Sequence, residues 1–255
     1  HIRPAGIDPL GGTVRREEVM KKTVWLLAVL TLMVTIIPLQ TMPALLPVDY
    51  SIGGEVRRWG SKYSYLILPM VTLLITLLWQ FLVAHFERRA VGDDKEAQGA
   101  AANAKVLVSV GLVMNLFFCL LQAGLLWSAA WTAEHFGTAG GAQAGASIAQ
   151  TAQKAMCVLT SVMLIVLGNI LPKTRKNRNV GVRLPYSRYN DITWQKSNRF
   201  GGTAMVIAGL LGMVSALLAP SAELALGLFT VFLLLAVIAT TWYSRKVYLE
   251  ESAEK

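Results

Sequence analysis

Six long apolar segments alternate with polar segments along the 255-residue chain. In chain order, the apolar segments cover residues 24–42, 64–86, 106–128, 155–171, 203–219 and 222–243. A transmembrane helix needs roughly 20 apolar residues, and about 17 is the lower limit, so the fourth and fifth segments are short. The pattern predicts an all-α, polytopic integral membrane protein with six transmembrane helices.

The positions of the cations predict how these helices are oriented. The polar segments before the first span, at 87–105, at 172–202 and after the last span hold 20 of the 24 Lys and Arg residues, while those at 43–63 and 129–154 hold the other four. Lys and Arg resist translocation, so we predict that both termini are cytoplasmic. The net charge of +9 then reflects topology, and direct nucleic-acid binding is not expected.

The same pattern divides the chain into three parts. Residues 1–19 lack an initiating Met, whereas a Met, two Lys and an apolar run follow, so we interpret 1–19 as a cloning scar or an upstream extension. Residues 20–105 form an N-terminal two-helix region with an outer loop at 43–63. Residues 106–255 form a four-helix region with a cytoplasmic loop at 168–202.

Local composition adds expectations for three further segments. Segment 90–104 is a polar linker that we expect to be partly helical. Segment 137–153 is rich in Gly and Ala, and we expect it to be flexible. In the fifth span, small residues recur at every fourth position from Ala204 to Ala216, which predicts a face that is buried against another helix.

The spans carry no residues that point to catalysis or ion coupling. None has Asp, Glu, Lys or Arg near its centre, and neither paired acids nor a nucleophile with its base can be identified. The two cysteines form no disulfide or metal-ligand pattern, so we expect no enzyme activity, no metal and no cofactor. A small-molecule or peptide transporter or exporter without an obvious ion-coupling site is the alternative. A structural or lipid-binding protein also stays open.

Polar residues in the third span form a candidate seam. Asn115, Cys119 and Gln122 are spaced four and three residues apart, so they lie on one face of the helix. Asn115 and Gln122 are therefore candidates for contact with a ligand. Hydrogen bonding between helices is the simpler interpretation, and we favour it.

The segment between the fourth and fifth spans is the most informative part of the chain. It carries eight Lys and Arg residues against one acid, Asp191. An electrostatic tether to anionic lipid needs only cations, whereas this segment also contains Pro, Gly, Asn and Trp. We therefore predict a shaped loop that lies flat on the membrane. In it, Arg183 bonds helix-end carbonyls or lipid phosphate, and Trp194 lies at the interface.

The outer loop at 43–63 is the second informative segment, because it combines Pro, Gly, aromatic residues and both signs of charge. Its candidate recognition residues are Pro47, Asp49, Gly54, Glu55, Trp59 and Lys62. The aromatic residues of such a loop can also serve as interfacial anchors. A compact recognition loop and an anchored interfacial element are both compatible with this composition.

The 168–202 segment resembles the signature of the SdpI-type bacterial membrane immunity family. The family pattern runs roughly G-N-x-x-P-K, N, G-x-R-x-P, then Trp and an Arg followed closely by Gly. After Gly168, its places are filled here by Asn169, Pro172, Lys173, Asn177, Gly181, Arg183, Pro185, Trp194, Arg199 and Gly202. The outer loop resembles the N-terminal domain that is often found in the same family.

The chain departs from this pattern at two histidine positions. Family members often have a Thr-His pair before the signature Arg, where this chain has Ser197 and Asn198. The outer loop commonly has a His two residues after its Pro, and here that residue is Asp49. The substitutions remove the obvious ligands for a metal and the obvious groups for pH sensing.

The resemblance implies a protein of the bacterial plasma membrane that gives tolerance to a secreted, membrane-active toxin peptide. Some members also act as the membrane receptor that holds a cytoplasmic transcriptional repressor when toxin is bound. The partners expected from the resemblance are therefore membrane lipids, a hydrophobic toxin peptide and, in a signalling member, such a repressor.

Overall fold

The structure is a computed structural model, and it describes residues 9–51, 53–92, 94–136, 138, 140–177 and 179–253. Side chains are described from residue 17 onwards within these ranges. Several parts of the predicted segments lie outside the described residues. They are residues 1–8 of the expected scar or extension, Ile52 of the outer loop, Asp93 of the linker, Gly137 and Ala139 of the Ala-rich segment, Arg178 of the inner loop, and residues 254 and 255.

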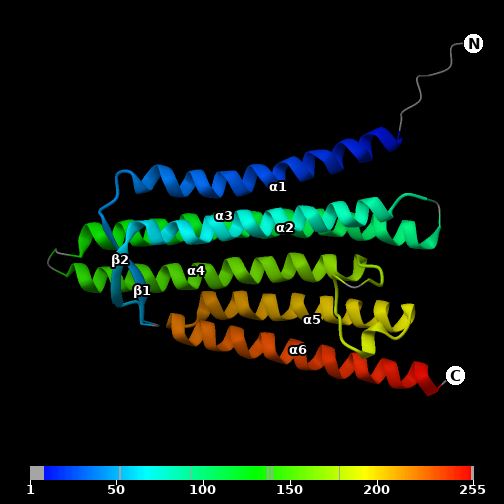
Figure 1. Ribbon diagram of the computed structural model, residues 1–255. Coiled ribbons are helices and arrows are strands. Elements are labelled where there is room, and N and C mark those ends of the chain that lie inside the picture. The colour runs from blue at the N-terminus through cyan, green and yellow to red at the C-terminus, as the bar shows by residue number, and fades with distance from the viewer. Residues whose placement is uncertain are drawn as a thin grey trace, which may run out of the picture.

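Six helices lie side by side in one elongated bundle (Figure 1). They are α1 (Pro9–Leu39), α2 (Ile67–Arg89), α3 (Lys95–His135), α4 (Gly141–Ile170), α5 (Asp191–Leu218) and α6 (Ala222–Ala253). All six are long and apolar enough to cross a membrane. Helices, 3₁₀ turns included, hold 82% of the described residues, so the all-α class with six spanning-capable helices is confirmed.

The helices extend well beyond the apolar segments of the sequence. The fourth and fifth helices have 30 and 28 residues, so the expectation of short spans was wrong. The Ala-rich segment 137–153, which was expected to be flexible, is helical from Gly141 because Ala is the strongest helix former. The linker 90–104 is helical from Lys95, as expected in part, and Asp94 caps it by accepting a hydrogen bond from the Ala97 N–H.

A β-hairpin replaces most of the predicted outer loop. Strands β1 (Leu45–Tyr50) and β2 (Val56–Ser61) pair antiparallel, and a short 3₁₀ turn, η1 (Lys62–Leu66), leads into α2. Sequence reasoning missed the strands because Pro47 and Gly60 are residue types that strands usually exclude. A glycine fits at position 60 because a Cβ there would lie 2.8 Å from Val48 Cγ2.

The helices differ in how much of their surface is covered by neighbouring helices. α5 packs between α4 and α6, and α3 packs against α1, α2 and α4. Helix α6 is the least covered, because only 6% of its apolar window is buried inside the protein. The predicted small-residue ridge of α5 is buried at Ala208, Gly212 and Ala216, and a Cβ at Gly212 would lie 2.9 Å from Ser161 Oγ of α4.

Both ends of the helical chain lie at the same end of the bundle. α1 begins and α6 ends there, and the α2–α3 and α4–α5 connections lie at that end as well, opposite the hairpin (Figure 1). Ion pairs fasten α1 here, with Lys21 against Glu87 of α2 and Glu17 3.0 Å from Lys105 of α3. We call this the inner end and the hairpin end the outer end, following the predicted topology.

The topology can be tested by cysteine labelling in a variant without Cys119 and Cys157. We expect an impermeant maleimide to modify intact cells that carry Arg57→Cys or Gln143→Cys, since both positions are exposed at the outer end. Asn179→Cys, exposed in the inner loop, should react only after the cells are opened. Labelling of Asn179→Cys in intact cells would overturn the predicted orientation.

Candidate functional site

The signature residues do not form one loop, contrary to the prediction of a loop over 168–202. Asn169 lies on α4, whereas Trp194, Arg199 and Gly202 lie on α5, which begins at Asp191. The inner loop itself covers residues 171–190 and contains two 3₁₀ turns, η2 (Leu171–Lys173) and η3 (Tyr186–Arg188). The inner site is therefore a loop held between two helix ends.

Trp194 is the centre of this site. Its side chain is 1% exposed, and its indole Nε1–H donates to the Thr174 carbonyl at 3.0 Å. The prediction that Trp194 lies at the membrane interface was wrong, because the loop folds over the ring and supplies its hydrogen-bond acceptor. Gly181, with φ of +118°, lies against the ring, where a Cβ would come 2.7 Å from Cζ2.

Asn198 lies one helical turn after Trp194 and holds the other side of the loop. Its Oδ1 accepts from the Val182 N–H at 2.7 Å, and its Nδ2 donates to the Trp194 carbonyl at 2.9 Å. The side chain is fully buried. The sequence marks this position only as a departure from the family histidine. The signal for its role in holding the loop was its spacing, because a polar residue four positions after Trp194 lies on the same face of the helix.

The turn at Asn177 gives the loop its local shape. Asn177 Oδ1 accepts from the N–H groups of Asn179 and Val180, both at 2.7 Å, and its Nδ2 donates to the Arg175 carbonyl at 2.6 Å. The loop is also tied to α3, since the Arg175 N–H donates to Asn103 Oδ1 at 3.0 Å. These bonds leave the backbone of the turn well satisfied.

Glycines bring α4 and α5 together beside the loop. A Cβ on Gly168 would lie 2.6 Å from the Gly202 carbonyl oxygen, and one on Gly202 would lie 2.5 Å from the Gly168 carbonyl oxygen. Pro172 covers the contact, with Cδ 3.0 Å from the same Cβ position on Gly202. No other residue type fits such an approach without moving the backbone.

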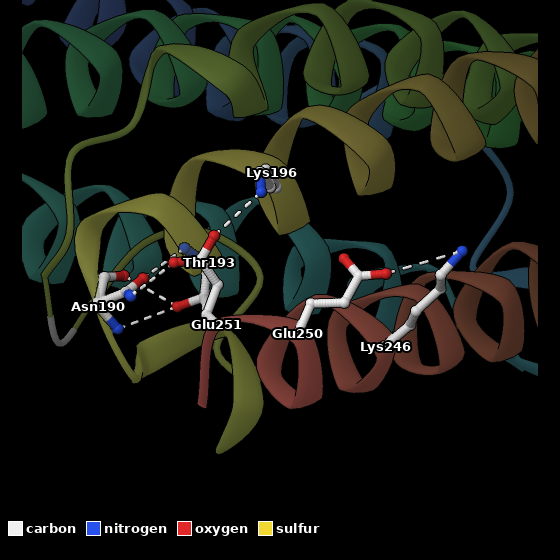
Figure 2. Close-up of polar contacts among 6 residues, drawn as sticks. All are labelled: Asn190, Thr193, Lys196, Lys246, Glu250 and Glu251. Atoms are coloured by element: carbon white, nitrogen blue, oxygen red, sulfur yellow. Dashed lines mark hydrogen bonds and ion pairs between the residues drawn. The ribbon is translucent and has the colours of Figure 1, made fainter. Parts of the chain in front are cut away.

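The last turns of α6 close the inner site (Figure 2). Asn190 and Thr193 form a capping box at the start of α5, and Asn190 Nδ2 also donates to Glu251 Oε2 at 3.2 Å. Lys196 forms an ion pair with Glu251 Oε1 at 3.0 Å. The carboxylate thus lies at the positive end of the α5 dipole and joins α6 to α5. The neighbouring Lys246–Glu250 pair, at 3.9 Å, stays within α6.

The remaining signature residues lie on the surface. Lys173, Arg183, Pro185 and Arg199 are all exposed. Arg183 Nη1 donates to the Asn179 carbonyl at 3.3 Å, so its partner here is a carbonyl within the loop and not a helix end. The predicted bond to lipid phosphate stays a prediction. The inner site therefore has a rigid buried frame and a basic outer face.

At the outer end, the hairpin is docked on α3 and α4. Its turn lies on α4, where Gln150 Nε2 donates to the Gly53 carbonyl at 2.8 Å and a Cβ on Gly54 would lie 2.4 Å from the Ala146 carbonyl oxygen. Trp59 packs edge to face on Phe136 just after α3, with ring centroids 4.8 Å apart. The hairpin is thus held by side chains from two regions of the sequence.

The candidate recognition residues of the hairpin divide into two groups. Pro47 and Gly54 are buried, and Trp59 and Lys62 are half-buried, so these four support the fold. Asp49 and Glu55 are exposed, with Asp49 opposite Arg58 in the strand register. The exposed acids and the neighbouring exposed Arg57 and Arg58 remain available to a partner.

The polar seam of α3 is used for packing. Asn115 Oδ1 accepts from Thr76 Oγ1 of α2 at 2.9 Å, and Gln122 Nε2 donates to the Tyr65 carbonyl at 2.9 Å. Cys119 lies between them and is buried. These bonds join α3 to α2 and η1, which confirms the favoured interpretation that the seam connects helices. Asn115 and Gln122 are 3% and 0% exposed, so the protein itself covers both side chains.

The described residues form six spanning-capable helices, and the α4–α5 loop is fixed by a buried Trp and Asn. Residues 173–244 match the family model described as the SdpI/YfhL protein family. This segment is therefore of the SdpI type, as the signature predicted. No curated protein and no solved structure matched the chain.

The resemblance of the outer loop to an N-terminal domain lies outside the matched residues and stays a prediction.

Replacement of Gly202 by Ala should separate α4 from α5. The new Cβ would lie 2.5 Å from the Gly168 carbonyl, so we expect a loss of about 1–3 kcal/mol in unfolding free energy. The matched control is Gly227→Ala on α6, where a Cβ meets no described atom within 4 Å. Thermal unfolding in detergent measures both variants, and equal Tm values would contradict the close approach.

Replacement of Asn198 by Leu should leave the half-buried Val182 N–H without an acceptor. We expect a loss of about 1–3 kcal/mol in unfolding free energy and faster proteolysis of the inner loop. Asn169→Leu is the control, because Asn169 is exposed and bonds only its own helix at Ile165 among the contacts described. Loop cleavage that is unchanged in Asn198→Leu would show that the Asn198 amide does not hold the loop.

Proposed function

We propose that this chain is an immunity protein of the bacterial plasma membrane, which gives tolerance to a secreted, membrane-active toxin peptide. The single observation that carries the proposal is the SdpI/YfhL match over residues 173–244. The six spanning-capable helices support a location in the membrane.

The hairpin is the proposed contact for the peptide. Under the predicted topology it is the largest structured element outside the helices at the outer end, and it presents Asp49, Glu55, Arg57 and Arg58 to solvent. Because the hairpin is already docked on α3 and α4, a partner would not have to order it. Preformed surfaces bind more tightly for the same contacts, since less conformational entropy is lost.

The inner site is the proposed contact for a cytoplasmic partner when toxin is bound. Its exposed cations Lys173, Arg183 and Arg199 would attract an acidic surface. α4 supplies a physical link, because it touches the hairpin turn at Ala146 and α5 at Gly168. A ligand that shifts the hairpin would thereby bias the position of α4 and the loop that follows it.

A tolerance assay tests the proposal. The chain is expressed in a bacterium sensitive to peptides encoded beside it in its own genome, and growth is measured against peptide concentration. The double variant Glu55→Gln with Arg57→Gln should lower tolerance about tenfold, as expected if one or two charged contacts are lost. Its matched control, Arg183→Gln with Arg199→Gln, removes exposed charge at the inner end and should retain tolerance.

The outcomes separate tolerance from the transport alternative. Loss of tolerance in the outer variant alone supports recognition by the hairpin. Absence of protection by the unaltered chain, together with substrate flux through it in liposomes, would favour a transporter. Equal loss in the outer and inner variants would contradict a recognition role that is confined to the hairpin.

A further inference from the structure

A pocket of about 360 Å³ lies at the outer end of α1, beside the 3₁₀ turn η1. Its lining consists of Ile36, Leu39, Gln40, Lys62, Tyr63 and Leu66. Ile37, next to Ile36 on α1, is 62% exposed. Ile67, next to Leu66 at the start of α2, is 65% exposed. The pocket therefore borders the apolar surface that the bilayer covers, at the level where two spans end.

Lys62 is the only cation in this lining, and its ammonium lies against the end of α1. It is half-buried, and its Nζ donates to the Leu39 carbonyl at 2.6 Å and to the Met42 carbonyl at 3.1 Å. An ammonium has three N–H donors, so these carbonyls leave one proton for another acceptor. The end of α1 supplies only about half of a negative charge, which does not neutralise the cation.

No carboxylate compensates this charge within the described part of the chain. Ion pairs are present for Lys21, Lys95, Lys105, Lys196 and Lys246, and none of them involves Lys62. The ring of Tyr63 lies 5.9 Å from Nζ and is 64% exposed. An aromatic ring and a Lys at the end of a span are typical of the depth of lipid headgroups.

We propose that this pocket binds a phospholipid of the outer leaflet. The phosphate accepts the third proton of Lys62 and a bond from the Gln40 amide, and an acyl chain lies along Ile36, Leu39 and Leu66. The chemistry of the lining, apolar walls with one incompletely neutralised cation, fits an anionic amphiphile. The location beside lipid-facing surface makes a lipid the occupant. The site does not depend on the proposed immunity function.

The test uses the full chain, stripped of lipid in detergent, with short-chain phosphatidylglycerol as the probe and native mass spectrometry as the readout. Lys62→Met keeps the length of the side chain and removes the charge. We expect it to bind the lipid about tenfold more weakly, as for loss of one charge-assisted hydrogen bond. Lys62→Arg keeps the charge and should restore most of the binding.

Lys154→Met is the matched control. Lys154 is also half-buried at the outer end, and its Nζ donates to the Ala219 carbonyl at the end of α5 at 2.6 Å, but it does not line the pocket. This variant loses the same kind of helix-end contact and should bind the lipid as the unaltered chain does. Equal losses in Lys62→Met and Lys154→Met would overturn the site.

A second variant and a second probe complete the test. Ile36→Trp fills the pocket and keeps Lys62, so it should weaken lipid binding even if Lys62→Met does not fold. Inorganic phosphate, titrated alone, distinguishes an anion site from a lipid site. Binding of phosphate as strong as that of phosphatidylglycerol, or unchanged lipid binding by Ile36→Trp, would overturn the proposal.

Discussion

The close approach of α4 and α5 at Gly168 and Gly202 fixes where the inner loop begins and ends. Helices in a bilayer gain little from apolar burial against one another, so contact between backbones must supply the packing. Here the contact lies directly before the inner loop, and Pro172 covers it. The loop consequently starts and ends at nearly fixed points, and Trp194 and Asn198 face it from the first turns of α5.

The helices were largely predictable from the sequence, and the tertiary role of single polar residues was not. Long runs of apolar residues are typical of helices that cross a bilayer, so the sequence predicts six spans directly. The packing face of α5 was also predictable, because small residues every fourth position have few other uses. Trp194 was assigned to the interface because its partner, the Thr174 carbonyl, is 20 residues away in sequence. The hairpin was not predicted, because strands seldom contain a proline such as Pro47.

Asn198 stands where the family pattern that the loop resembles often has a His, and it makes two hydrogen bonds. The amide presents an acceptor to the Val182 N–H and a donor to the Trp194 carbonyl at the same time. A neutral imidazole can do this as well, but its donor and acceptor pattern changes with protonation. The amide does not titrate, so the bonds that hold this loop do not depend on pH in the physiological range.

Lys62 and Lys154 change the meaning of the charge count along the chain. Each bonds a carbonyl at the end of a helix, Leu39 of α1 for the first and Ala219 after α5 for the second. A cation in that position balances the partial negative charge of the helix terminus and becomes part of its electrostatics. Two of the four basic residues at the outer end thus bond carbonyls at the ends of helices. Under the predicted topology, a count of the cations in the outer segments therefore includes two that are already bonded to the ends of helices.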